Sequence, residues 1–154
     1  MLSLRKKKMT EKLEMVLKPI GFVCNKYKEN PDQEDWWQEL VSEIVIDENL
    51  EEGLDKLEKN SYYIILYWLH KRDRDNLPLR INPKGRKDIP KRGLFTTRTP
   101  DRPNPIGMIT VKLLKREGNV LTVQGLDAFD GTPVIDIKPW NIGYDAMDGE
   151  VYRD

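Results

Sequence analysis

Short apolar stretches alternate with turn-forming residues along most of the chain, at a spacing typical of an antiparallel β-protein. The most apolar stretch, residues 61–69, contains Tyr, Ile, Leu and Trp without alternation, so we expect a strand that is buried on both faces. Residues 117–119 are Glu-Gly-Asn and predict a hairpin turn between two strands. The remaining strands are expected at residues 17–23, 43–47, 93–97, 108–115, 120–125 and 134–138.

Helices are predicted to be few and short. Residues 49–57 place three leucines on one helical face behind an Asn49 cap and early acidic residues, which predicts a short helix. Residues 71–92 are polar, basic and interrupted by Pro and Gly, so we expect a long mobile loop. The pattern predicts a single all-β domain with one or two short helices, as an antiparallel barrel or sandwich. Its expected parts are a leader at 1–16, the β-domain at 17–140 and a tail at 141–154.

Charge is distributed in blocks, although the 154-residue chain has no net charge. Residues 1–28 carry eight Lys or Arg against two acidic residues, 29–60 two against twelve, 61–102 eleven against four, and 103–154 five against eight. The basic blocks could steer a polyanion to one face of the protein. They could equally belong to a soluble surface of mixed sign.

Soft metal ligands and targeting signals are scarce. Cys24 is the single cysteine and His70 the single histidine, which excludes an intrachain disulfide and leaves too few ligands for a zinc site. The apolar run at 62–69 is too short to cross a bilayer, and no apolar signal segment follows the basic residues near Met1. We therefore expect a cytoplasmic protein with no metal and no membrane anchor.

Residues 97–107 form the stiffest segment, because three prolines lie within six residues and restrict the backbone. Arg98 and Arg102 can make paired, charge-assisted bonds to a carboxylate or a phosphate. Asn104 offers a donor and an acceptor, and Gly107 permits close backbone approach. This segment is therefore predicted to be a binding loop whose side chains are in place before a ligand arrives.

A second polar group surrounds an Asp-Gly turn and comprises Asp127, Asp130 and Asp136. Asp130 could simply cap the turn, and Asp136 could pair with Lys138 on a solvated face. Considered together with the binding loop at residues 97–107, the three carboxylates favour a functional role. Strict alternation would place Val134, Asp136 and Lys138 on one face of the strand, and Ile135 and Ile137 on the other.

Two blocks of sequence together resemble the signature of the TsaA-like family of TrmO-type tRNA methyltransferases. The first is TRTPDRPNPIG at 97–107, and the second is LDAFDGTPVIDIKP at 126–139. Members of that family methylate N6 of adenosine in tRNA with S-adenosylmethionine, and their fold is a β-barrel. The resemblance, which covers residues 19–140, thus implies a barrel, S-adenosylmethionine as cofactor and tRNA as partner. It also implies N6-threonylcarbamoyladenosine in the anticodon loop as the substrate.

Individual residues receive roles from this resemblance and from their chemistry. A base or orienting role is expected of Asp130 and Asp136, and Arg98 is included with them as catalytic. His70 could instead be a surface or packing residue. Contacts to the substrate are expected from Arg86, Lys87, Arg102, Asn104 and Lys138. The cofactor-binding set is Glu34, Asp35, Trp36, His70, Lys71, Arg98, Met108, Gln124, Gly125, Leu126 and Asp127.

Large aromatic residues are concentrated in the first half of the chain. Adjacent tryptophans on a strand point to opposite faces, so at most one of Trp36 and Trp37 is expected to meet a ligand. Packing in the core or in a dimer is the alternative for either. More aromatics than a small barrel readily encloses favour a homodimer, as does the resemblance. The aromatics in question are Trp36, Trp37, Tyr62, Tyr63, Tyr67 and Trp68.

Three functions remain open from the sequence. Rossmann, Walker and nucleophile-elbow motifs are all absent, so a methyltransferase of the TsaA-like kind is favoured. A non-catalytic module that binds S-adenosylmethionine, a nucleotide or RNA is the alternative, because Cys24, Lys71 and Trp140 depart from the family pattern. An interaction protein that uses its charged faces would leave the arginine loop unexplained.

Overall fold

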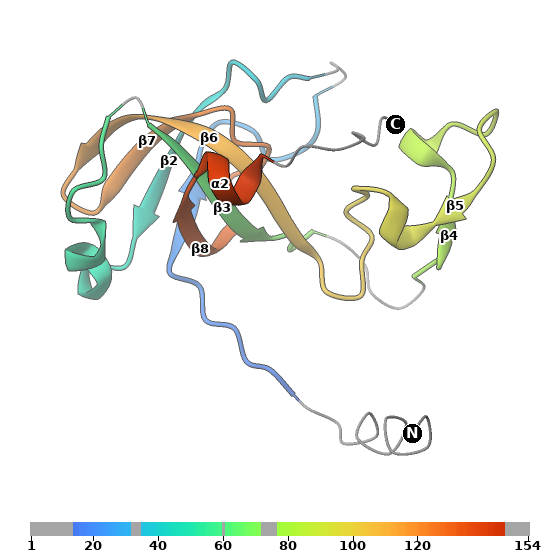
Figure 1. Ribbon diagram of the computed structural model, residues 1–154, viewed down its shortest axis with the longest axis horizontal. Helices are drawn as coiled ribbons and strands as arrows, with labels where there is room; N and C mark the ends of the chain where they lie inside the picture. The colour runs from blue at the N-terminus through green and yellow to red at the C-terminus, as the bar shows by residue number, and fades with distance from the viewer. Residues whose placement is uncertain (1–13, 32–34, 60, 72–76, 147–154) are drawn as a thin grey trace.

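The computed structural model describes residues 14–31, 35–59, 61–71 and 77–146 and contains a closed antiparallel barrel (Figure 1). The strand order around the barrel is β1-β2-β7-β6-β3-β8. This confirms the predicted all-β barrel. The strands are β1 (Gly21–Cys24), β2 (Val41–Ile46), β3 (Tyr62–Trp68), β6 (Ile106–Glu117), β7 (Val120–Gln124) and β8 (Pro133–Pro139).

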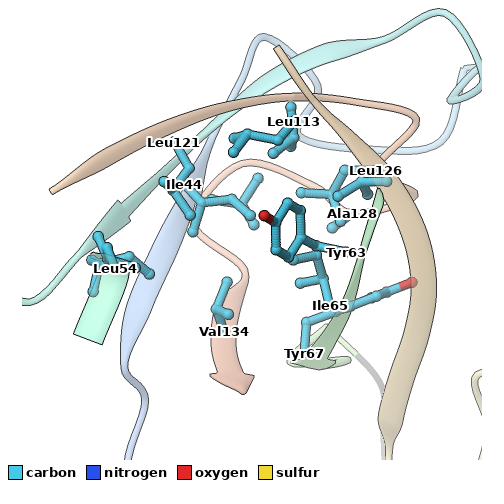
Figure 2. Close-up of a cluster of buried hydrophobic side chains, with 14 residues drawn as sticks. Ile44, Leu54, Tyr63, Ile65, Tyr67, Leu113, Leu121, Leu126, Ala128 and Val134 are labelled. Atoms are coloured by element: carbon cyan, nitrogen blue, oxygen red, sulfur yellow. The ribbon is translucent and has the colours of Figure 1, made fainter. Parts of the chain in front are cut away.

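The core fills the inside of the barrel with alternate side chains from each strand (Figure 2). On β3, Tyr63, Ile65 and Tyr67 are buried, whereas the residues between them are only partly buried. The prediction that this strand is buried on both faces was wrong. A closed barrel has a single interior, and the outer face of β3 remains accessible, with Tyr62 53% exposed.

A β-bulge interrupts the pairing of β3 with β8. Leu66 pairs with Asp136 and Tyr67 pairs with Val134, so Ile135 has no partner on β3. An extra residue of this kind bends the strand and changes the direction of the side chains that follow it.

The bulge overturns the predicted faces of β8. Val134 is fully buried, and Ile137 beyond the bulge packs against the same core. Asp136 and Lys138 therefore lie on the outer face, opposite to Val134. The prediction from strict alternation was wrong here because it assumes that every residue of β8 is paired, and Ile135 has no partner on β3.

The predicted hairpin is confirmed: β6 and β7 pair through a turn at Gly118, whose φ of 58° is the left-handed region that glycine tolerates. The predicted helix is a 3₁₀ helix, η1 (Glu48–Leu54), and its cap is Asp47 rather than Asn49. The carboxylate of Asp47 accepts from the Asn49 backbone N–H at 2.9 Å, and bonds to Asn49 hold the pKa of Asp47 below its usual value.

Residues 77–97 form a small lobe beside the barrel (Figure 1). It contains the two-stranded sheet of β4 (Arg80–Ile81) and β5 (Arg92–Gly93), with 3₁₀ turns η2 (Pro83–Gly85) and η3 (Leu94–Thr96). Buried Leu94 anchors the lobe. The described residues of the segment expected to be a mobile loop thus include short strands and a 3₁₀ turn. The strand expected at 93–97 is mostly the turn η3.

Regular structure begins and ends close to the barrel in the described residues 14–146. The strand predicted from residue 17 begins only at Gly21, and a short helix α2 (Ile142–Asp145) follows β8. The leader, up to residue 13, lies outside the described residues. In the part of the chain that the structure describes, no helix is long and apolar enough to span a membrane.

Candidate functional site

One end of the barrel carries an open pocket with a volume of about 1190 Å³. Five segments that are distant in sequence line it: residues 30–31 with 35–37, the end of β3 with the residues after it, residues 97–100 with Arg102, the start of β6, and residues 127–129 with Thr132. The predicted residues that line it are Asp35, Trp36, His70, Lys71, Arg98, Arg102, Met108 and Asp127. Both sequence blocks of the resemblance therefore meet at one place.

Tyr67 and Gly107 form the floor of the pocket where β3 pairs with β6. A Cβ atom at Gly107 would overlap the Tyr67 ring, so only glycine fits at this position without movement. Burial, and then the charge of Asp127, raise the pKa of the Tyr67 hydroxyl, whereas the charge of Arg98 opposes them. Tyr67, Asp127 and Arg98 are therefore close enough to influence one another.

Asp127 presents its carboxylate at the pocket and remains accessible to solvent. The surrounding protein nevertheless displaces enough water to raise the pKa of this carboxyl group above its usual value. A raised pKa makes a carboxylate a better proton acceptor near neutral pH.

Backbone carbonyl groups hold both arginines of the proline-rich loop. Arg98 donates from Nη2 to the Met108 carbonyl at 2.7 Å, and Arg102 donates from Nη1 to the Thr97 carbonyl at 2.8 Å. A guanidinium group has five N–H donors, so further donors remain for an anion. The two side chains are thus oriented by the loop itself.

Aromatic rings form one wall of the pocket. Trp36 and Trp37 lie in a turn at residues 35–39 rather than on a strand, so the alternation expected for a strand does not apply to them, and both line the pocket. Trp36 stacks parallel to Phe129, with 6.0 Å between the ring centroids, and also contacts Tyr27 at 4.8 Å. These rings offer flat apolar surfaces of the kind that bind a nucleobase.

His70 and Lys71 lie next to this wall. The His70 Nδ1 atom is 3.4 Å from the hydroxyl of buried Thr132. The Lys71 ammonium group lies 5.1 Å from the Phe129 ring centroid and donates to the Lys28 carbonyl. The pocket therefore contains positive charge from two sides, Lys71 and Arg98. Among the described residues, no three His, Cys, Asp or Glu side chains gather into a metal site.

Three residues of the expected cofactor set lie outside the lining of the pocket. Gln124 donates to the Glu39 carboxylate at 2.8 Å, and the Gly125 N–H donates to the Leu40 carbonyl. The side chain of Leu126 is fully buried in the core. Glu34, which belongs to the same set, lies outside the described residues.

Asp130 and Asp136 also have partners within the fold. Asp130 accepts from the Asn25 backbone N–H at 3.1 Å, and Asp136 pairs with Lys138 at 2.6 Å on the outer face of β8. None of these three expected site residues, Asp130, Asp136 and Lys138, lines the pocket. The Asp136–Lys138 pair matches the structural alternative that the sequence had left open, whereas the partner of Asp130 is the distant Asn25 rather than its own turn.

The expected substrate contacts divide into two groups. Arg102 lines the pocket, whereas Arg86, Lys87 and Asn104 are exposed residues outside it. Arg86 forms a two-point ion pair with Asp88, with a shortest distance of 2.6 Å. This pairing holds the pKa of Asp88 below its usual value and offsets the charge that Arg86 could offer to a phosphate.

Two residues of structural importance were not found from the sequence. The sequence suggests only a packing or interface role for Tyr67, although its place near the end of β3, three residues before His70, was a usable signal. Asn25 received no role, yet its amide donates to the Ser42 hydroxyl at 3.0 Å and to the Ala128 carbonyl at 2.9 Å. Asn25 thereby links two strands to the segment that positions Asp127.

Residues 22–146 match the family model of the tRNA-methyltransferase O N-terminal domain. A protein of Archaeoglobus fulgidus named S-adenosyl-L-methionine-binding protein is 44% identical over 135 residues, which cover 86% of this chain and 94% of that protein. The tRNA (adenine(37)-N6)-methyltransferase of Mus musculus is 43% identical over 98 residues, which cover 64% of this chain but 22% of that enzyme.

Solved structures show the same fold. A crystal structure of TrmO superposes with a TM-score of 0.71 and 28% identity, covering 91% of this chain and 64% of that one. TrmO from Pseudomonas aeruginosa superposes with a TM-score of 0.70 and 27% identity, covering 90% of this chain and 62% of that one. The chain thus spans somewhat less than two thirds of these solved proteins.

Proposed function

The chain belongs to the family of the tRNA-methyltransferase O N-terminal domain, and from this premise we propose that it methylates N6 of adenosine in tRNA with S-adenosylmethionine. One observation supports this most strongly. The pocket brings a guanidinium group, a carboxylate with a raised pKa and stacked aromatic rings together from separate segments. Because the longer mouse enzyme is matched over only 22% of its length, its activity is assigned to this chain as a proposal.

The residues of the pocket fit S-adenosylmethionine. Arg98 would hold the methionine carboxylate, Asp127 would accept from the ribose hydroxyls or from the substrate, and Trp36 would stack on the adenine. The pocket volume of about 1190 Å³ exceeds the roughly 300–1,000 Å³ of an ordinary ligand site. It therefore leaves room for a target nucleoside beside the cofactor.

Bound S-adenosylmethionine supplies an electrophilic methyl group on a sulfonium. The chain must then align N6 with that methyl group and remove the N6 proton. We assign the role of proton acceptor to Asp127 instead of to Asp130 or Asp136, because Asp127 lines the pocket and they do not. The hydroxyl of Tyr67 stays protonated because its pKa is raised, so it can act as a hydrogen-bond donor that orients a ligand or the Asp127 carboxylate.

The proposed substrate is N6-threonylcarbamoyladenosine in the anticodon loop. Its threonyl group carries a carboxylate, for which Lys71 and Arg102 are the candidate partners because both line the pocket. Recognition of an unpaired loop base by stacking and edge contacts is the usual way in which proteins read RNA.

Assembly as a homodimer in the cytoplasm remains part of the proposal. Tyr63 and Tyr67 are enclosed by the barrel, so they no longer argue for an interface. Tyr62, Trp140 and Tyr144 remain exposed, at 53%, 39% and 85%, and are available for one. Light scattering at tens of micromolar tests this point, and the mass of a monomer would contradict it.

One experiment tests the reaction. The purified chain is incubated with labelled S-adenosylmethionine and either tRNA that bears the threonylcarbamoyl group or tRNA that lacks it, and the nucleosides are analysed by mass. We expect methylation only of the first. Equal methylation of both would reject the proposed substrate but keep the enzyme.

A second candidate function is a binding module for S-adenosylmethionine without turnover. The name of the Archaeoglobus fulgidus relative, which this chain matches over 94% of its length, favours it. The engagement of Asp130 and Asp136 in structural contacts also favours it. Cofactor binding by calorimetry, without methylation of either tRNA, would establish this alternative.

A further inference from the structure

The 3₁₀ turn η3 displays a phenylalanine to solvent. Phe95 is 75% exposed, whereas its neighbour Leu94 is 1% exposed. The hydroxyl of Thr96 donates to the Gly93 carbonyl at 2.8 Å, and the hydroxyl of Thr97 donates to the Leu94 carbonyl at 2.9 Å. With Leu94 buried and the turn fixed by these bonds, the Phe95 ring is held outward rather than left there by disorder.

Arg102 connects this ring to the pocket. Its guanidinium carbon lies 5.8 Å from the Phe95 ring centroid, within the range of a cation–π contact. The same side chain is fixed by the Thr97 carbonyl and lines the pocket. A ligand part stacked on Phe95 would therefore lie directly beside a ligand part in the pocket.

The surroundings of Phe95 are strongly basic. Residues 77–102 contain eight Lys or Arg against two acidic residues, Asp88 and Asp101. An exposed aromatic ring among cations matches single-stranded nucleic acid, in which a flat base adjoins a phosphate. A second copy of this chain would have to bring the same basic surface against an apolar contact, which repulsion disfavours.

We propose that Phe95 and Arg102 form a stacking platform for an unpaired RNA nucleotide adjacent to the nucleotide bound in the pocket. The proposal rests on the proposed function in one respect, that the substrate is RNA. The base stacks on the Phe95 ring, and Arg102 lies at the phosphate between the two nucleotides. The platform thus selects a loop over a duplex, because paired bases cannot reach the ring.

Anisotropy measurements with two labelled RNAs test the platform: a hairpin that carries an anticodon loop and a blunt duplex of the same stem sequence. Stacking of one base contributes about 1–3 kcal/mol, so Phe95→Ala should weaken hairpin binding about 5- to 150-fold. Binding of the duplex and the slope of affinity against salt should both stay unchanged, because no phosphate contact is lost.

Three further variants separate stacking from apolar contact. Phe95→Trp should retain hairpin affinity, whereas Phe95→Leu should lose it as Phe95→Ala does, because leucine has no π-face. Leu79→Ala is the matched control: Leu79 is 70% exposed in the same lobe and is bonded through its carbonyl to Leu94, but it is not aromatic. It should bind both RNAs as the wild type does.

The outcomes distinguish this inference from the proposed function. The platform is overturned if Phe95→Ala weakens binding of hairpin and duplex equally, or if Leu79→Ala causes an equal loss. It is also overturned if Phe95→Ala lowers the mass of the protein in solution, which would mean that a second copy covers the ring. If the wild type methylates tRNA but Phe95→Ala binds the hairpin normally, only the platform fails. If the wild type transfers no methyl group but Phe95→Ala loses the hairpin selectively, the platform stands alone.

Discussion

Replacement of Gly107 by alanine tests how the floor of the pocket is built. The new Cβ would overlap atoms Cε2, Cζ and Oη of Tyr67. Tyr67 is 5% exposed and is paired directly opposite Gly107 on β3, so its ring has little space into which to move. Either the ring leaves its place or β3 and β6 separate locally.

The expected cost follows from overpacking in a closely packed interior. Extra methyl groups of this kind cost about 1–3 kcal/mol of unfolding free energy. For a domain of this size, 1 kcal/mol corresponds to about 2–4 °C in melting temperature, so Gly107→Ala should lower it by about 2–12 °C. Because Tyr67 also lines the pocket, binding of S-adenosylmethionine should weaken as well.

Urea unfolding of four proteins measures the effect: wild type, Gly107→Ala, Tyr67→Leu and the double variant. Leucine lacks the ring atoms that the new Cβ would meet, so Gly107→Ala should cost almost nothing in the Tyr67→Leu background. The coupling free energy should therefore be about 1–3 kcal/mol. Gly93→Ala is the control, since a Cβ at Gly93 meets nothing within 4 Å.

Two results would refute this reasoning. Gly107→Ala could be as stable as the wild type, which would mean that the ring is free to move. Alternatively, its full cost could persist without the Tyr67 ring, which would assign the strain to the backbone of β6 instead.

Three other variants extend these tests. Asp127→Asn should stabilise the protein at neutral pH, because a raised carboxyl pKa means that the ionised form of Asp127 costs stability. The gain in unfolding free energy should grow as pH rises through the folded-state pKa and vanish below about pH 3.8. Urea midpoints measured across this pH range test it, and a constant gain would contradict it. Arg98→Ala should weaken S-adenosylmethionine binding by about 1.5–3 kcal/mol, roughly 10- to 150-fold by calorimetry, through loss of a charge-assisted bond, and unchanged affinity would remove Arg98 from the site. Asn25→Ala should lower the unfolding free energy by about 1–3 kcal/mol, because the Ala128 carbonyl and the Ser42 hydroxyl lose a donor; a neutral result in urea would show that water replaces the amide.

The sequence determined the barrel and the binding loop to a large extent, because both depend on local chemistry. Short apolar runs and the Gly118 turn specified antiparallel strands without reference to distant residues. The prolines between 97 and 107 likewise fixed a loop that orients Arg98 and Arg102, and the structure gives each arginine a backbone partner.

Tertiary structure alone decided which carboxylate faces the pocket. Asp127, Asp130 and Asp136 are equivalent as sequence, but Asn25 binds Asp130 and the bulge at Ile135 places Asp136 on the outer face. A bulge depends on how two strands pair, and the alternation of apolar and polar residues along one strand does not determine that pairing. Of the three carboxylates, only Asp127 lines the pocket.

The role of each aromatic residue was also settled only by the fold. Tyr67 and Phe95 are both large aromatic residues, yet Tyr67 is buried inside the barrel against Gly107 and Phe95 on η3 is exposed to solvent. Burial depends on what other segments bring against a ring, and those segments are far away in sequence. The chain thus determines its strands and its stiff loop locally, whereas long-range packing determines the site.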